Sequence, residues 1–178
     1  MIDAEGPVGR IRLSKITELG EGTVRTLTRH LENKGLIVTS REGVTLTEAG
    51  RRLTSNLKLF IGQETKIPPT ALTVGPRNVA VLVKNASNLV KTGVEQRDAA
   101  IKVGALGATT LIFSCGKLQM PLADEDVFPK DSKVHNLLIS ELRPSDNDIV
   151  IIGSANDEST AEIGAIAAIL ETLRIKKD

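Results

Sequence analysis

Residues 22–36, GTVRTLTRHLENKGL, constrain the fold of this chain more than any other stretch. Val24, Leu27 and Leu31 recur at positions i, i+3 and i+7, which places them on one side of an α-helix. Gly35 then supplies a residue that tolerates the left-handed conformation in which many helices end. The stretch therefore predicts one amphipathic helix with a defined stop.

The other side of this predicted helix carries hydroxyl, guanidinium and imidazole groups. Arginine can hydrogen-bond to guanine, and hydroxyl or guanidinium groups bind phosphate. The candidate DNA-contacting residues on this helix are Thr23, Arg25, Thr26, Arg29 and His30. An ordinary solvated helix face is the alternative, with Thr23 as a helix cap and His30 as a surface or packing residue.

The flanking segments favour the first interpretation. A short helix is predicted over residues 10–17, and a turn with two glycines follows it. The β-branched residues 36–39 and the segment 44–46 predict a hairpin with a charged tip. Thr47 then provides a favourable N-cap for a third helix.

Two helices, a hairpin and a closing helix in this order resemble the winged helix-turn-helix module of bacterial and archaeal transcriptional regulators. The resemblance covers residues 9–59. It rests on the GEGTVR sequence that opens the second helix, on the spacing of Val24, Leu31, Gly35 and Leu36, and on the LTEAGR sequence after the hairpin. It implies that the second helix contacts double-stranded DNA.

The resemblance also implies that Arg41, at the tip of the wing, reaches the DNA backbone or a neighbouring minor groove. An exposed hairpin that happens to carry an arginine is the alternative. Such modules normally have a helix ahead of this region, and only eight residues precede Gly9. Either the chain is short at its start, or a partner or the later helix covers that side of the core.

Pro68 and Pro69 block helix formation, so we place the domain boundary there, with a winged domain over residues 1–66 and a second domain over residues 67–178. Continuous apolar runs at residues 79–83 and 149–152 predict strands buried on both faces. Helical spacing alternates with strands in between. We therefore expect a small α/β domain, roughly β-α-β-β-α-β-α, and an α+β chain overall.

Two segments of the second domain are candidates for binding a small-molecule effector. Lys91, Thr92 and Gly93 precede a predicted helix whose free N–H groups can bind an anion, and Arg97 lies one turn further. A capping box that begins at Thr92 is the structural alternative, because it uses two of those donors. Arg97 and the adjacent aspartate can equally form a solvated pair.

The second candidate segment follows the strand of residues 149–152. Gly153, Ser154 and Asn156 belong to the polar sequence GSANDE, which we expect to form a loop at the end of that strand. Loops of this kind often carry ligands in α/β folds. A plain helix-capping turn is the alternative.

Composition limits the remaining classes of function. One cysteine and two histidines make a structural metal site improbable, and we expect no metal or cofactor. An aromatic content of 2% leaves no platform for stacking single-stranded nucleic acid. Apolar runs are too short for a membrane span and no signal-peptide core is present, so we expect a cytoplasmic protein.

The formal net charge of +1 conceals an uneven distribution. Residues 1–66 hold 11 Lys and Arg against 8 Asp and Glu, a net +3, whereas residues 67–178 hold 12 against 14, a net −2. Only the first part favours a polyanionic partner, and it does so mildly.

The chain as a whole is similar to a family of archaeal proteins of uncharacterised function, through its winged start, KTGVEQRDAAIKVGA and IVIIGSANDE. We expect a DNA-binding transcriptional regulator, not an enzyme, that acts as a homodimer and whose second domain dimerises or senses an effector. An enzyme fused to a winged helix and a winged module that only assembles proteins are the alternatives.

Overall fold

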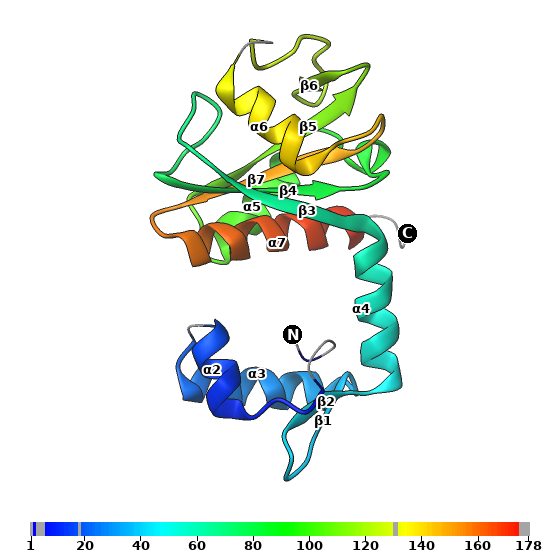
Figure 1. Ribbon diagram of the computed structural model, residues 1–178, viewed down its shortest axis with the longest axis vertical. Helices are drawn as coiled ribbons and strands as arrows, with labels where there is room; N and C mark the ends of the chain where they lie inside the picture. The colour runs from blue at the N-terminus through cyan, green and yellow to red at the C-terminus, as the bar shows by residue number, and fades with distance from the viewer. Residues whose placement is uncertain (1, 3–5, 18, 130–131, 175–178) are drawn as a thin grey trace. The chain divides into compact units, whose positions relative to one another are not determined.

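The helices and the hairpin of the first unit, residues Met1–Lys58, follow the predicted order. The elements are α2 (Arg10–Thr17), α3 (Glu21–Asn33), β1 (Ile37–Thr39), β2 (Val44–Leu46) and α4 (Glu48–Phe60) (Figure 1). Helix α4 begins in this unit and ends two residues beyond it. The computed structural model describes residues 2, 6–17, 19–129 and 132–174. Val8 adds an isolated bridge to Val44 of the hairpin. The core of the unit is Val8, Leu13, Val24, Ile37 and Val44.

The second unit, residues Leu59–Asp178, begins earlier than the predicted boundary at residue 67. Strand β3 (Ile61–Ile67) pairs antiparallel with β4 (Arg77–Val83), so it belongs to this unit's sheet. The two prolines end β3 and do not mark the start of the unit. The sequence concealed this edge strand because its central residues, GQETK, are mostly polar and its partner lies beyond the prolines.

The sheet has the strand order β3-β4-β7-β5-β6, in which β5 is Gly107–Ser114, β6 is Lys117–Gln119 and β7 is Ile149–Ala155. Every neighbouring pair is antiparallel. The last strand in sequence therefore occupies the centre. The predicted series of elements is present with one additional strand at its start, and the class is α+β.

Helices cover both faces of this sheet (Figure 1). Short helix η1 (Ser87–Leu89) precedes α5 (Val94–Lys102), which packs with α7 (Glu158–Arg174) on one face. Helix α6 (Lys133–Leu142) lies on the other face, against β3 and β4. The unit thus has three layers.

Small residues of α7 permit its close approach to the sheet. Ala161 and Ala165 lie directly over Gly153 of β7, where any Cβ at position 153 would collide with the carbonyl oxygen of Ala161. Gly164 faces the side chains of Ala100 and Ala105 at the end of α5. The small residues of this helix therefore serve packing within one chain.

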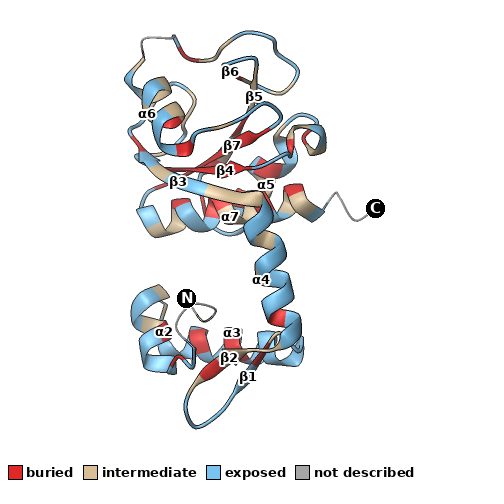
Figure 2. Cartoon of the chain, turned by 45° about the vertical axis from the view of Figure 1, so that its right-hand side comes forward, coloured by how far each residue is buried: buried red, intermediate tan, exposed pale blue. Residues whose placement is uncertain are grey.

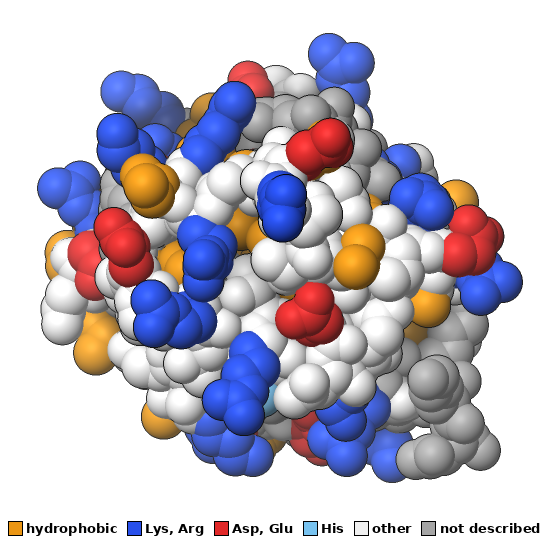
Figure 3. Space-filling model, turned by 90° about the horizontal axis from the view of Figure 1, so that it is seen from below, with side chains coloured by type: hydrophobic (Ala, Val, Ile, Leu, Met, Phe, Trp, Pro, Cys, Tyr) orange, Lys and Arg blue, Asp and Glu red, His pale blue; other side chains and the backbone are white. Residues whose placement is uncertain are grey.

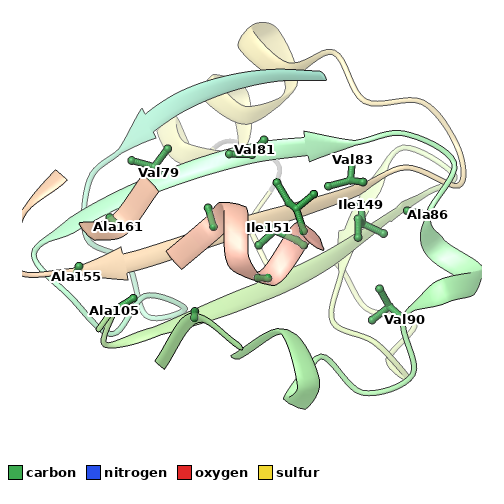
Figure 4. Close-up of a cluster of buried hydrophobic side chains, with 14 residues drawn as sticks. Val79, Val81, Val83, Ala86, Val90, Ala105, Ile149, Ile151, Ala155 and Ala161 are labelled. Carbon is green, nitrogen blue, oxygen red and sulfur yellow. The ribbon is translucent and has the colours of Figure 1, made fainter. Parts of the chain in front are cut away.

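Most of the buried side chains lie in this second unit (Figure 2). One cluster fills the space between the sheet and the helices α5 and α7, with Val79, Val81, Ile149 and Ile151 pointing from the strands (Figure 4). Both predicted apolar strands are buried, as expected. Within the described ranges, none of the helices combines the length and the apolar character that a membrane crossing requires.

Candidate functional site

The five residues predicted to contact DNA on helix α3 are all exposed: Thr23, Arg25, Thr26, Arg29 and His30. Arg25 and Arg29 are four residues apart, so their side chains emerge from the same face of the helix. The hydroxyl of Thr26 donates to the carbonyl of Gly22 at 3.1 Å. The structure therefore presents two exposed arginines about one turn apart on the same face of the helix.

The opposite side of α3 holds the helix on the core. Val24 is 4% exposed and Thr28 is 9% exposed. The hydroxyl of Thr28 donates to the carbonyl oxygens of Val24, at 2.9 Å, and of Arg25, at 3.0 Å. Sequence reasoning missed Thr28 as a buried residue, although its position four residues after Val24 placed it on the inward face.

Leu27 and Leu31, which were predicted to share one side of the helix with Val24, are 45% and 38% exposed. They line an open groove of about 310 Å³ together with Leu13, Leu19 and Leu46. Helical periodicity correctly assigned both leucines to the apolar face. It could not show that the described residues leave this part of the face uncovered.

A network of hydrogen bonds fixes the wing to the end of α3. The helix ends at Asn33, and Gly35 has a φ of 68°, as the predicted stop requires. The carboxylate of Glu32 accepts from the N–H of Thr39 in β1 at 3.0 Å. The hydroxyl of Thr47 donates to the carbonyl of Gly35 at 2.6 Å and accepts from the N–H of Gly50 at 3.0 Å. The wing and the next helix are thereby held in register with α3.

The tip of the wing is a tight turn that exposes Arg41. Ser40 and Gly43 exchange backbone hydrogen bonds of 2.9 and 3.3 Å. Gly43 has a φ of 135°, and a Cβ there would lie 2.8 Å from the backbone of Val8. Arg10, at the start of α2, lines the same small hollow as Arg41. Arg10 was not a predicted site residue, because only the fold places it beside the wing.

Lys and Arg side chains are spread over the face drawn in Figure 3, with Asp and Glu among them. This mixed distribution agrees with the modest net charge of the N-terminal residues. On this face, neutralisation of DNA phosphates would therefore depend on individual basic side chains and not on one continuous positive patch.

Part of the first predicted ligand-binding segment does line a hollow in the second unit. This hollow, called the α5 hollow below, has a volume of about 300 Å³. Thr92, Gly93 and Arg97 line it from the α5 side, and Gly107, Thr109 and Thr110 line it from β5. Lys91 is exposed and is not among the lining residues. The β5 residues were missed because only tertiary structure brings them beside α5.

The capping box predicted from Thr92 to Glu95 does not form in the expected way. Gly93 is the N-cap, with a φ of 82°, and as a glycine it has no side chain that could cap the helix. The hydroxyl of Thr92 instead accepts from the N–H of Val94 at 3.3 Å and lies 3.4 Å from the carboxylate of Glu95. The residue before the helix adopts the left-handed conformation because it is a glycine.

The second predicted ligand-binding segment is only partly a loop. Gly153 and Ser154 lie inside β7 and are buried, so the prediction that they form a loop is wrong. The hydroxyl of Ser154 donates to Oδ1 of Asn78 on the neighbouring strand at 2.6 Å. Of the three predicted residues, only Asn156 is exposed, in the turn that follows the strand. Strand β7 extends further than its apolar run because Gly153 and Ser154 pair with Val79 and Asn78 of β4.

Comparisons with known proteins agree with the two-unit structure. Residues 74–173 match the family model described as Domain of unknown function (DUF4443), which is more than half of the chain. The chain belongs to the DUF4443 family. In this DUF4443 protein, residues 1–61 also match the model of the CggR N-terminal DNA binding domain. The predicted combination of a winged-helix regulator and an uncharacterised C-terminal domain is confirmed.

A solved structure resembles this DUF4443 protein over almost its whole length. It is the hypothetical protein PH0730 from Pyrococcus horikoshii OT3, which is 28% identical, with a TM-score of 0.61. The alignment covers 98% of this chain and 94% of the other. No curated protein matched the chain.

Proposed function

We propose that this protein is a transcriptional regulator that binds an operator through α3 and the wing, and that it is not an enzyme. The observation that carries the proposal is the paired exposure of Arg25 and Arg29 on a helix locked to the wing, within residues that match a DNA-binding domain model. The major groove of B-DNA admits one α-helix, and winged modules insert their second helix there.

In this arrangement the two arginines of α3 contact base edges. Arg41 at the wing tip, with Arg10 beside it, contacts phosphates. Thr23, Thr26 and His30 lie on the same exposed helix and contact phosphates or bases at its margins. The hydrogen bond from Thr39 to Glu32 supports this assignment, because it fixes the wing relative to the helix.

We further propose that the protein binds DNA as a homodimer and that the second unit dimerises, senses an effector, or does both. A single module with a modest positive charge makes few phosphate contacts, and two-fold pairing doubles them. Two recognition helices placed about one DNA turn apart would then require a palindromic operator. Sedimentation equilibrium of the full chain, alone and with operator DNA, measures this stoichiometry.

The experiment that tests the proposal begins with genomic DNA fragments selected by the full chain and sequenced. A recurrent sequence supports a regulator, whereas random recovery at every salt concentration contradicts it. Fluorescence anisotropy then compares binding of that sequence by the native protein, by the double variant Arg25→Ala with Arg29→Ala, and by Arg174→Ala. Arg174 is an exposed arginine of the second unit and serves as the matched control.

We expect the double variant to lose at least tenfold in affinity, with an unchanged unfolding temperature, while the control variant binds normally. Unchanged binding by the double variant would show that α3 is not the DNA-contacting helix. Recovery of no preferred DNA, together with stable capture of other proteins, would favour the protein-assembly alternative.

A further inference from the structure

The α5 hollow contains a buried hydroxyl without a hydrogen-bond partner. Thr110 is 2% exposed, and its Oγ1 has no partner among the described residues. This oxygen faces the start of α5, because a Cβ placed on Gly93 would lie 3.8 Å from it. A buried hydroxyl that makes no hydrogen bond destabilises the fold, so a bound group that accepts from it would be favoured.

The start of α5 supplies further donors to the same hollow. Gly93 and Val94 both line it; the N-cap Gly93 has no side chain to cap this nine-residue helix, and the hydroxyl of Thr92 accepts only from the N–H of Val94, at 3.3 Å. The first N–H groups of a helix have no intrahelical acceptor and carry partial positive charge. An acceptor that reaches Thr110 through the α5 hollow therefore also meets the positive end of a helix.

The edge of β5 also lies along the hollow. Strand β6 pairs only with Ile112–Ser114 of β5, so in the described part of the chain the segment 107–111 has no strand on that edge. Gly107 allows Val74 to pack closely, since a Cβ at position 107 would lie 3.1 Å from Cγ2 of Val74, whereas Cγ of Arg97 would lie at an ordinary contact distance of 3.8 Å. The absence of a pairing strand leaves the hollow open to solvent at this edge.

The charge of the lining favours an anion. Arg97 is the one charged residue among those that line the hollow in the described structure. Its Nε and Nη2 donate to Oδ1 of Asp98 at 3.1 and 3.0 Å, and a guanidinium has further N–H groups to offer. The carboxylates of Asp98 and Glu95 are adjacent to the hollow but do not line it.

The remaining lining is apolar and sets the shape of the ligand. Val74, Val94, Leu106 and Met120 are partly exposed around the hollow. A volume of about 300 Å³ is at the lower limit for small-molecule sites and is too small for a dinucleotide. The site therefore suits a ligand with one anionic group and a compact apolar body.

We propose that the α5 hollow binds a small organic monocarboxylate, whose carboxylate accepts from Thr110 and from the first N–H groups of α5 and whose apolar body contacts Val74, Leu106 and Met120. The carboxylate would be the effector that the second unit senses in the function proposed above. Only the claim that its binding regulates DNA binding rests on that proposed function. The site consists of residues of the second unit. Its test measures ligand binding directly, so failure of DNA binding would leave it untouched.

The test uses the full chain and four probes: isovalerate, its neutral analogue isovaleramide, acetate and inorganic phosphate. Binding is followed by calorimetry and by the amide NMR shifts of residues 93–97 and 107–110. We expect isovalerate to bind at least tenfold more tightly than isovaleramide or acetate and to shift these amides. Phosphate binding that equals or exceeds isovalerate binding would overturn the proposed ligand class.

Three variants distinguish a ligand-binding role from a structural role. Thr110→Val removes the hydroxyl with little change in shape, and we expect at least fivefold weaker isovalerate binding with an unfolding temperature that is equal or higher. Arg97→Gln, at an exposed position, is expected to weaken binding similarly without affecting the fold. Lys102→Gln, at the other end of α5, is the matched control and should bind normally. Equal binding by the native protein, Thr110→Val and Arg97→Gln, or amide shifts located elsewhere, would overturn the proposal.

Discussion

Gly50 lies so close to the carbonyl oxygen of Leu36 that a Cβ at position 50 would collide with it. The contact joins the first turn of α4 to the segment that leads from α3 into the wing. Thr47 reinforces it, because its N–H donates to the same Leu36 carbonyl at 3.0 Å. This close packing gives a physical reason for the glycine in the LTEAGR sequence.

Gly50→Ala should therefore destabilise the first unit, although alanine is the better helix former. Overpacking of this kind costs about 1 to 3 kcal/mol, and a collision with backbone atoms, which cannot rotate away, belongs at the upper end of that range, above the gain in helix propensity of about 1 kcal/mol. Urea unfolding monitored by circular dichroism measures the change. Gly22→Ala is the matched control, because nothing lies within 4 Å of a Cβ there, and it should be neutral or stabilising. Equal stability of the two variants would show that the Leu36 contact relaxes freely.

Arg25 and Arg41 should contribute to DNA binding in different ways. Loss of a base contact in Arg25→Ala is expected to cost about 1 to 3 kcal/mol on the preferred sequence and little on random DNA. Loss of a phosphate contact in Arg41→Ala should weaken binding to the preferred sequence and to random DNA alike. The number of counterions released on binding, measured from the salt dependence of the affinity, should fall by about one. Anisotropy titrations on both DNAs at several salt concentrations separate these outcomes. If the two variants lost the same affinity for the preferred sequence and the same affinity for random DNA, the assigned roles would be contradicted.

Ser154 should be essential for stability and not for ligand binding. Its hydroxyl satisfies Oδ1 of Asn78, whose Nδ2 donates to the carbonyl of Gly75 at 3.1 Å. Ser154→Ala leaves a buried acceptor unsatisfied, which costs about 1 to 3 kcal/mol. Ser140→Ala, at an exposed position of α6, is the control and should change stability by less than about 0.5 kcal/mol. Equal free energies of unfolding for Ser154→Ala and Ser140→Ala would refute this interpretation.

Glu162 should make the second unit less stable as the pH rises. Partial burial raises the pKa of Glu162 above its usual value of 4.5, and the nearby carboxylates of Glu64 and Glu158 raise it further. Since the pKa is higher in the folded than in the unfolded state, the folded state binds its proton more tightly. The associated stability is present below pH 4.5 and is lost as the pH rises through the folded-state pKa.

Glu162→Gln removes this charge and should stabilise the protein at pH 7. The gain should be less than about 1 kcal/mol, because the side chain is largely solvated. Unfolding temperatures measured from pH 4 to pH 8 should diverge for the native protein and the variant as the pH rises. A constant difference across this range would show that the carboxylate does not titrate differently on folding.

Local features of the first unit could be predicted from its sequence. Gly35 ends α3 and Thr47 caps α4, since both effects depend on groups only a few residues apart. The exposed positions of Arg25 and Arg29 followed from helical periodicity.

The second unit was less predictable, because its contacts join residues far apart in sequence. The polar strand β3 became recognisable only through its pairing with β4, and Gly153 and Ser154 proved to be strand residues through theirs. Helical periodicity likewise placed Leu27 on an apolar face without revealing that the face is open.

By itself, the sequence determined the turns and caps of the first unit and the faces of its helices, because dihedral preferences and hydrogen bonds between near neighbours specify them. Only the tertiary structure decided that β7 occupies the centre of the sheet and that Thr110 lies beside Gly93 with an unsatisfied hydroxyl. Strand pairing and side-chain burial depend on which distant segments share a core. Which segments pack together depends on the packing of the whole unit and cannot be read from any local sequence pattern.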